Sequence, residues 1–169
     1  MINISFIDEV TLSTSAFGVE YDNPLSGVLQ FNQRNGNTKD ISGNFRFGAS
    51  DSAITIEGPF SKSDNNRTTF IFSARKSYLQ FLFKLIGLPI RPDYWDFQGK
   101  INHKIDDYNS LNIIGLGAID DFSVEAPDDF DFTQQSFLEQ VPIIMQNSTT
   151  IGASWVRKFK EAKGQFVLA

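Results

Sequence analysis

Four charged residues fall on the polar sides of three segments in which apolar and polar residues alternate. They are Glu57, Arg75, Asp96 and Lys100. Opposite charges on one face of neighbouring strands can pair with each other or with a segment that covers them. The chemistry open to these side chains is therefore electrostatic pairing. On a solvated sheet face, the same four side chains would be ordinary surface charges.

The other reactive side chains form no catalytic pattern. Ser73, Ser77 and the single His103 make no recognisable arrangement of a nucleophile with a base that a carboxylate orients. The sequence has no Gly-rich phosphate loop. It also has no Cys, which excludes disulfides and thiolate chemistry. We therefore predict no enzymatic activity, no catalytic residue and no cofactor.

One stretch of the sequence, residues 120–131, is rich in carboxylates that could bind Ca²⁺ through oxygen ligands. Its acidic residues are Asp120, Asp121, Glu125, Asp128, Asp129 and Asp131. The stretch lacks the spacing and the glycine of an EF-hand loop. A solvated acidic loop is the favoured interpretation, and no metal site is predicted.

The composition narrows the class of protein. The chain has 169 residues and a net charge of −5, which argues against nucleic-acid binding, where a basic patch is expected. Its 17 Phe favour strands and bring a large apolar area. No run of about 18 apolar residues is present, so no transmembrane helix is predicted. Residues 1–6 lack the features of a signal peptide, which by itself favours a cytosolic protein.

Alternation of apolar and polar residues predicts a chain made of strands. The predicted strands are residues 9–13, 28–34, 43–50, 53–60, 68–78, 94–105, 111–122, 148–159 and 165–169. From residue 43 onward they are expected to form one antiparallel meander, in which Glu57 and Arg75 share a face. Eight apolar residues should lie on the opposite face: Phe45, Phe47, Ile54, Ile56, Phe70, Phe72, Phe97 and Ile101.

Strand and loop lengths bear on two interpretations of this sheet. A soluble sheet with one solvated face and a membrane barrel with lipid outside show the same alternation. The strand at 94–105 is longer than the usual mean of about 5–6 residues and can cross a bilayer, which takes roughly 9–11. The connections at 106–110 and 160–164 are short, whereas those at 83–93 and 123–147 are long, as in outer-membrane barrels.

Seven short motifs occur in a particular order along the chain. The first four are Glu9-Val10, Glu20-Tyr21-Asp22-Asn23, Ser26-Gly27-Val28 and Gln33-Arg34-Asn35-Gly36-Asn37. The last three are Glu57-Gly58-Pro59-Phe60, Ser73-Ala74-Arg75-Lys76-Ser77-Tyr78 and Tyr94-Trp95-Asp96-Phe97-Gln98-Gly99-Lys100. In order and spacing, the motifs resemble TonB-dependent outer-membrane receptors of the Bacteroidetes type, from the end of the plug domain to the first strands of the barrel.

The resemblance implies an all-β fold. Residues 1–37 would be the C-terminal part of the plug domain. Residues 38–169 would be the N-terminal portion of the barrel, a partial antiparallel transmembrane meander of about seven strands. The chain would be a fragment of a receptor in the cell outer membrane that imports a scarce ligand, such as a siderophore, a vitamin or an oligosaccharide.

The resemblance also implies the partners of the chain. They are the remainder of the barrel and plug, the lipid of the outer membrane, and the TonB energy-transducing protein. The family engages TonB through a segment that this chain lacks. No nucleic-acid partner is expected.

Roles for individual residues follow from the same resemblance. The four charges would face the barrel lumen and hold the plug, and the eight apolar residues would face lipid. Tyr78, Trp95 and Trp155 would belong to the aromatic girdle at the membrane interface; packing in a core is the alternative for them. The alternative for the whole chain is a soluble all-β binding or structural domain, such as a sandwich, without catalysis. A sandwich would cover the apolar face with a second sheet, and lipid contact needs no such cover.

Overall fold

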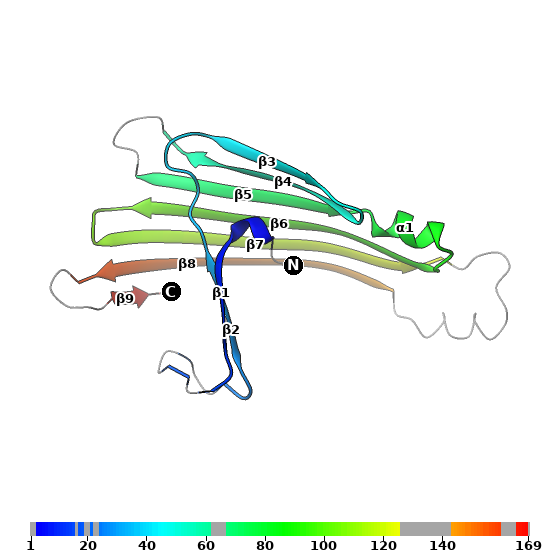
Figure 1. The fold of residues 1–169 in the computed structure, drawn as a ribbon, viewed down its shortest axis with the longest axis horizontal. Coiled ribbons are helices and arrows are strands. Elements are labelled where there is room, and N and C mark those ends of the chain that lie inside the picture. The colour runs from blue at the N-terminus through cyan, green and yellow to red at the C-terminus, as the bar shows by residue number, and fades with distance from the viewer. Residues whose placement is uncertain are drawn as a thin grey trace.

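The computed structural model describes residues 3–15, 17–18, 21, 24–61, 67–125, 143–159 and 165–168. In this part of the chain the fold is mostly β, with antiparallel strands in two separate sheets (Figure 1). One sheet has two strands and the other has seven. None of the helices in the described ranges has the length and apolar character that crossing a membrane requires.

The small sheet is formed by the first part of the chain. A 3₁₀ turn, η1 (Ile4–Phe6), begins after Asn3, whose side chain accepts a hydrogen bond from a backbone amide of the turn. The turn leads into β1 (Ile7–Ser13), which pairs with β2 (Val28–Gln33). We call the described residues between 3 and 37 the N-terminal unit. Figure 1 shows its two strands running crosswise to those of the large sheet.

The large sheet is a meander in which each strand pairs with its neighbours in sequence. Its strands are β3 (Ser42–Phe47), β4 (Asp51–Pro59), β5 (Thr68–Ser77), β6 (Ile90–Lys104), β7 (Asn109–Val124), β8 (Ile144–Lys158) and β9 (Gln165–Leu168). The meander predicted from residue 43 onward is confirmed. The sheet is not closed into a barrel.

Two connections define the ends of this sheet. The helix α1 (Leu79–Leu85) joins β5 to β6 at one end, which we call the helix end. Residues 105–108 join β6 to β7 at the opposite end, the turn end. There the Asp106 carboxylate accepts hydrogen bonds from the amides of Tyr108 and Asn109, both at 2.7 Å. Asp stabilises tight turns in this way because its side chain replaces a backbone acceptor.

The register between strands decides which side chains share a face. Ala53 lies opposite Arg75, which in turn lies opposite Asp96. Glu57 is on the same face as Ala53 because side chains alternate along a strand. The prediction that Glu57 and Arg75 share a face is therefore confirmed. We call this the polar face and the other the apolar face.

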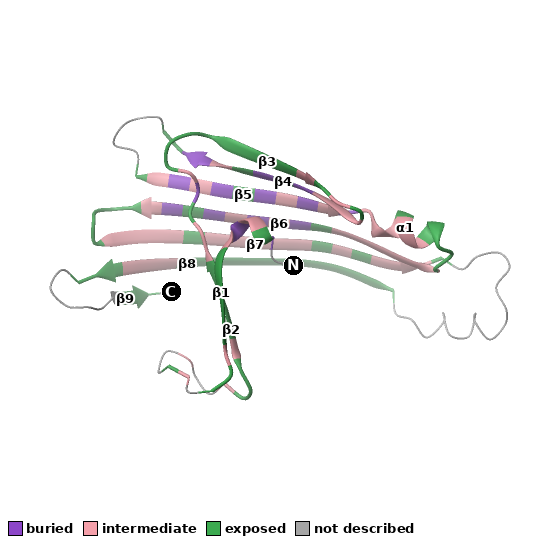
Figure 2. Cartoon of the chain, in the orientation of Figure 1, coloured by how far each residue is buried: buried purple, intermediate pink, exposed green. Residues whose placement is uncertain are grey.

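Burial is inverted relative to that of a soluble protein. On the polar face Ser73 is 2% exposed, whereas on the apolar face Phe47 is 75% exposed. Figure 2 shows buried residues alternating with more exposed ones along β5 and β6. Among the described residues, the buried hydrophobic side chains are Phe6, Ala53 and Ile71. This part of the chain therefore has very little hydrophobic core.

The connection predicted to be long at residues 83–93 is long, but it lies earlier, at residues 78–89, and it contains a helix. α1 occupies residues 79–85, and β6 begins at Ile90, opposite Val124. The helix forms from Leu, Phe, Gln and Lys, none of them β-branched. It ends near Gly87, whose φ of 74° favours glycine. With α1 present, the fold is mostly β rather than all-β.

Other strand boundaries also differ from the prediction. β3 ends at Phe47, three residues before the predicted strand end at residue 50. The loop predicted at 123–147 is shorter, since β7 continues to Val124 and β8 begins at Ile144. Backbone pairing with β6 extends β7 to Val124, and pairing with β7 extends β8 back to Ile144, where side-chain alternation has already stopped. The turn predicted at 160–164 lies outside the described residues.

Candidate functional site

The N-terminal unit contacts the polar face of β4, β5 and β6, and Arg34 makes the most extensive of these contacts. Its backbone amide donates to the Phe6 carbonyl at 2.9 Å, and its Nε donates to the Ser5 carbonyl at 2.7 Å. Its Nη1 and Nη2 donate to the two carboxylate oxygens of Glu57 at 2.6 and 2.8 Å. Such two-bond pairing of guanidinium and carboxylate fixes orientation as well as distance. Arg34 therefore joins η1, the end of β2 and the large sheet.

A third hydrogen bond to Glu57, from Asn37, reinforces this contact. The Asn37 amide donates to the Glu57 carboxylate at 3.0 Å, so one side chain of β4 accepts three bonds from the N-terminal unit. The hydrogen bonds to Glu57 raise the pKa of the Arg34 guanidinium above its ordinary value. Arg34 is therefore charged at every physiological pH, and the pairing is controlled by position rather than by titration.

Lys100 makes the next contact along the polar face. Its Nζ donates to the carbonyl of Gln33 at 2.6 Å. Gln33 directly precedes Arg34 in the sequence. Lys100 is buried, and Ile71 lies opposite it on β5. A buried ammonium group requires hydrogen-bond acceptors. The carbonyl at the end of β2 supplies one, which anchors this end of the small sheet to β6.

Asn3 forms the third contact, far from the first two in sequence. Its backbone amide donates to Gln98 Oε1 at 3.0 Å, and its Nδ2 donates to Ser73 Oγ at 2.5 Å. Thr55 Oγ1 bonds the same hydroxyl at 3.2 Å. All four residues are buried. Buried polar side chains are stable only when bonded, so this cluster specifies where the N-terminal unit can lie.

Gly36 allows the backbone of the N-terminal unit to approach β5 closely. A Cβ atom added at this position would lie 2.0 Å from the Phe70 carbonyl oxygen, inside van der Waals contact. Only glycine fits so close to another backbone. Gly36 follows Arg34 and precedes Asn37, so it permits the two bonded residues on either side to reach Glu57 together.

Arg75 and Asp96 pair with each other on the wall of the sheet. Arg75 Nε donates to Asp96 Oδ2 at 2.9 Å, and Nη2 contacts the same oxygen. Nη1 lies 3.6 Å from Asp51 Oδ2, and the guanidinium carbon lies 5.5 Å from the Tyr94 ring centroid. The four predicted charges therefore divide into two kinds. Glu57 and Lys100 bind the N-terminal unit, whereas Arg75 and Asp96 join β5 to β6.

The residues predicted to lie on the face opposite these charges do so. Ile54 lies opposite Ala74, which lies opposite Phe97, and all are on the apolar face. Most of the predicted set is exposed: Phe45, Phe47, Ile54, Ile56, Phe72 and Ile101, while Phe70 and Phe97 are intermediate. Ile113, Ile119 and Ile151 extend the same exposed surface over β7 and β8.

The three predicted aromatic residues lie at two levels of the apolar face. Tyr78 follows β5 at the helix end and stacks on Phe47, with ring centroids 5.5 Å apart. Trp95 stacks on Phe97 at 6.0 Å, and Trp155 lies towards the turn end in contact with Phe166. The prediction placed Trp95 near a strand end, but β6 begins earlier than predicted, at Ile90, so Trp95 is inside the strand.

Sequence reasoning missed several residues of the contact surface. Asn3, Ser5, Ser73 and Gln98 were not assigned to it, and Arg34 was noted only as part of a motif. The negative charge predicted for Glu57 on the polar face was the one signal of a cationic partner, and Arg34 is followed by an Asn-Gly pair at the point where the backbone approaches β5. Nothing in the local sequence pattern indicated Asn3, which is 95 residues from Gln98.

The described residues show no group of three or more His, Cys, Asp or Glu that could hold a metal ion. His103 Nδ1 bonds the Thr68 hydroxyl at 2.7 Å on the apolar face. Asp128, Asp129 and Asp131 lie outside the described residues, so the interpretation of residues 120–131 stays a prediction. The arrangement as a whole binds one part of the chain to another by ion pairs and hydrogen bonds.

Comparisons with known proteins add no relative. No family model matches this chain, and neither a curated protein nor a solved structure matches it significantly. Its residues and their geometry are therefore the basis for a functional proposal.

Proposed function

We propose that this chain is part of an outer-membrane receptor of the TonB-dependent kind, which imports a scarce ligand through a plugged β-barrel. The large sheet would be a section of the barrel wall, and the N-terminal unit would be the last part of the plug. One observation carries the proposal. A single meander exposes its apolar face, and the polar face of β4, β5 and β6 is buried where a segment of the same chain contacts it.

The apolar face supports a lipid environment. Phe45, Phe47 and Ile151 are between 68% and 75% exposed, on strands at different positions in the sheet. Contiguous exposed apolar surface of this kind marks an interface, a membrane contact or a tendency to aggregate. In a sandwich, a second sheet would cover these residues. No second sheet covers them within the described part of the chain.

Strand length and aromatic position support a bilayer-spanning wall. β6, β7 and β8 have 15, 16 and 15 residues, more than the roughly 9–11 that cross a bilayer. Trp95 lies opposite Ile119 of β7, and Trp155 lies opposite Leu111. Ile119 and Leu111, which mark the levels of the two Trp residues, are about 26 Å apart along β7 at about 3.3 Å per residue. With a tilt of about 40°, the height is about 20 Å, near the apolar band of about 25 Å in such barrels.

The polar face supports a plugged lumen. Glu57, Lys100 and Ser73 hold the N-terminal unit by side-chain bonds rather than by a hydrophobic core. Ion pairs and hydrogen bonds between a plug and a wall can be exchanged one at a time with water, so the plug can rearrange without unfolding the barrel. We infer an import cycle in which an energy transducer in the periplasm rearranges the plug. Siderophores, vitamins and oligosaccharides are the ligand classes in this proposal.

The proposal predicts how the isolated chain behaves in water. Without detergent it should elute as oligomers or aggregates on size-exclusion chromatography, because the apolar face and the unpaired edges of β3 and β9 are both exposed. In detergent micelles it should elute as a smaller species with strand-rich circular dichroism. A sharp monomer peak in water, with cooperative thermal unfolding, would exclude the membrane wall and favour a soluble all-β domain.

A further inference from the structure

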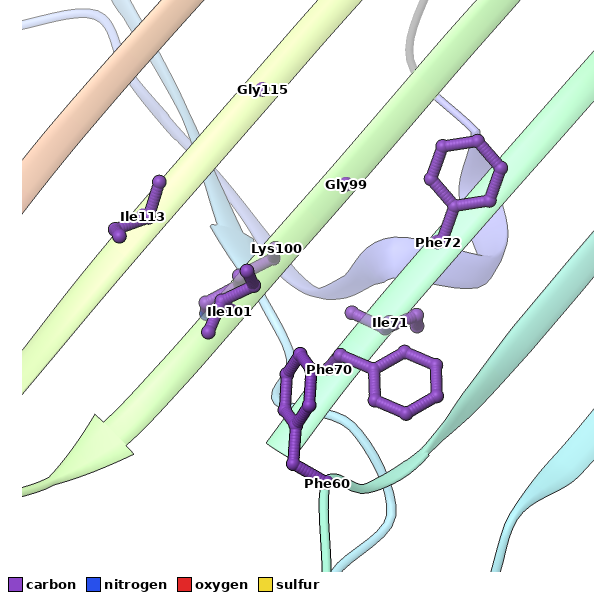
Figure 3. A pocket seen from close by; sticks show the side chains of 9 residues that line it. All are labelled: Phe60, Phe70, Ile71, Phe72, Gly99, Lys100, Ile101, Ile113 and Gly115. Atoms are coloured by element: carbon purple, nitrogen blue, oxygen red, sulfur yellow. The ribbon is translucent and has the colours of Figure 1, made fainter. Parts of the chain in front are cut away.

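The exposed apolar surface of the large sheet continues as far as the helix end. Figure 3 shows the middle of this surface, where apolar side chains surround a hollow of about 360 Å³, among them Phe60, Phe70, Phe72, Ile101 and Ile113. Towards the helix end, Phe47 is 75% exposed, and the Tyr78 ring stacks on it. Tyr78 directly precedes α1, and its carbonyl accepts a bond from the Phe81 amide at 3.0 Å. The apolar surface therefore reaches the first turn of α1.

α1 is apolar on the side that it exposes. Phe81 and Leu85, one helical turn apart, are 62% and 82% exposed, and Ile86 at the end of the helix is 69% exposed. Leu82 and Phe83, on the other side, are only partly exposed. A surface helix of a soluble protein carries polar side chains on its outer side. The apolar outer side of α1 therefore indicates that apolar material covers it.

The strand register gives the level of α1 along the sheet. β5 pairs with β6 as far as Lys76 and Trp95, and α1 follows at Leu79. Gln80 Nε2 donates to Asp93 Oδ2 at 3.2 Å, which holds the first turn of the helix to β6. Asp93 lies two residues beyond Trp95 on the same face, about 5 Å further out at about 3.3 Å per residue and a tilt of about 40°. The headgroup layer of a bilayer is about 5–8 Å thick on each side, and belts of Trp lie at its level.

The charged side chains at this level suit a boundary between lipid and water. Lys76 pairs with Asp93 and lies over the Trp95 ring, 5.1 Å from the ring centroid. Lys84 is exposed directly beside Leu85. A lysine at such a boundary keeps its apolar stem in lipid while its ammonium group reaches water. The charges near α1 are therefore compatible with an apolar side that is immersed in lipid.

We propose that α1 is an interfacial helix, whose exposed side is buried where headgroups meet acyl chains. This side is formed by Phe81, Leu85 and Ile86. The inference rests on the proposed function, since it requires the apolar face of the sheet to lie in a bilayer. The bilayer is the occupant because the exposed side of α1 is continuous, through Tyr78 and Phe47, with the face that lipid would cover.

The length of α1 supports the same assignment. The helix has seven residues, and isolated helices shorter than about 12–15 residues are only marginally stable in water. Its stability must therefore come from contacts on its sides. β6 provides contacts on one side, and lipid would provide them on the other.

Fluorescence quenching by brominated lipids can measure the depth of the helix. The reporter chain carries Phe81→Trp, and its own two Trp are removed by Trp95→Phe and Trp155→Phe. Because Phe81 is exposed, the new ring disturbs little packing. The full chain is folded into phosphatidylcholine vesicles with bromine either close to the headgroup or near the ends of the acyl chains. Bromine close to the headgroup should quench at least about twice as strongly, since interfacial helices bury their apolar side only about 5–10 Å deep.

Two reference chains define the limits of the measurement. In a Trp155→Phe chain, Trp95 alone reports, and it should be quenched because it lies on the wall. Glu9→Trp, with both original Trp replaced by Phe, reports from an exposed position of β1 in the small sheet. This chain should show almost no quenching.

Two substitutions at neighbouring exposed positions test the apolar side itself. Leu85→Glu in the reporter chain should lower the quenching towards the Glu9→Trp value, because a carboxylate is unfavourable among acyl chains. Lys84→Gln, which removes a charge instead of adding one, is the matched control and should leave the quenching unchanged. Circular dichroism checks that each variant keeps its strands.

The outcomes distinguish the two proposals. If Trp95 were quenched and the Phe81→Trp reporter gave only the Glu9→Trp value, water, a protein partner or another segment of this chain would cover α1. That result would overturn the inference and leave the proposed function standing. Strongest quenching by bromine near the chain ends, or quenching that Leu85→Glu leaves unchanged, would do the same. Absence of quenching at both positions would overturn the proposed function together with the inference.

Discussion

The two faces of β6 are built from adjacent residues and behave in opposite ways. Asp96, Gln98 and Lys100 are buried, whereas Trp95 and Ile101, on the other side of the same strand, are exposed. In a soluble sheet the apolar side would be buried, because burying apolar area is the main stabilising term of folding. The contrast shows that the buried side of this sheet is selected by hydrogen bonds and ion pairs rather than by hydrophobicity.

The largest expected effect comes from a charge on the apolar face. Ile101→Arg should cost about 2–4 kcal/mol of folding free energy in lipid vesicles if Ile101 lies near the bilayer midplane. Urea titration of the vesicle-bound protein measures this cost. Ile105→Arg, beyond the end of the strand, is the matched control and should cost about 0–1 kcal/mol. Equal costs at the two positions would remove the evidence for a depth-dependent lipid environment.

On the polar face, the strongest test is the Glu57 carboxylate. Glu57→Ala removes two bonds from Arg34 and one from Asn37, and leaves a partly buried guanidinium without its partner. Because both side chains keep some solvent contact, we expect a cost of about 1–3 kcal/mol. Limited proteolysis should show faster cleavage in the N-terminal unit.

A matched carboxylate on the small sheet controls for loss of charge. Glu9 is exposed and accepts one bond from Asn32 at 3.2 Å. Glu9→Ala should change stability by less than about 0.5 kcal/mol. If Glu57→Ala and Glu9→Ala gave the same proteolysis rate, the Arg34–Glu57 pair would have no role in holding the N-terminal unit.

Two glycines sharpen the comparison between a crowded face and an open one. Gly36→Ala forces a Cβ against the Phe70 carbonyl and should cost about 1–3 kcal/mol, as overpacking does. Gly115→Ala faces open space and should cost less than about 0.5 kcal/mol. Hydrogen exchange of the β1 and β2 amides should rise in the first variant only. A neutral Gly36→Ala would mean that the N-terminal unit can shift away from β5 without loss.

The smallest effect concerns pH at the turn end. Hydrogen bonds from Asn109, and then from the Tyr108 amide, lower the pKa of Asp106. A lowered folded-state pKa means that its contribution is complete above the unfolded value of about 3.9 and is lost as pH falls through the folded value. Amide exchange at Tyr108 should therefore be protected equally at pH 7 and pH 5, and the protection should be lost only in stronger acid.

A substitution at this turn provides the control. Asp106→Asn keeps one side-chain acceptor but has no carboxyl group to titrate. In this variant, the hydrogen-exchange protection of the Tyr108 amide should therefore no longer fall in acid because of protonation at position 106. If the variant and the original chain lost protection at the same pH, a different group would be responsible.

Sequence patterns predicted the meander and the faces well, and the N-terminal contacts poorly. Alternation along 94–105 placed Phe97 and Ile101 on one face and Lys100 on the other without any knowledge of partners. The alternation of apolar and polar residues did not predict the start of β6, because backbone pairing with β7 continues to Ile90. It also gave no sign of α1, because a short run of Leu and Phe is compatible with helix, strand or loop.

By itself, the sequence determined which side chains of each strand lie on the same face. The alternating side chains and the short Asp106 turn are local features, and they oblige the apolar residues of neighbouring strands to share a face. The tertiary structure alone decided what covers the polar face. Arg34 meets Glu57 across 23 residues and Asn3 meets Ser73 across 70. Contacts of that kind depend on how the chain folds back on itself, which a local pattern of apolar and polar residues does not encode.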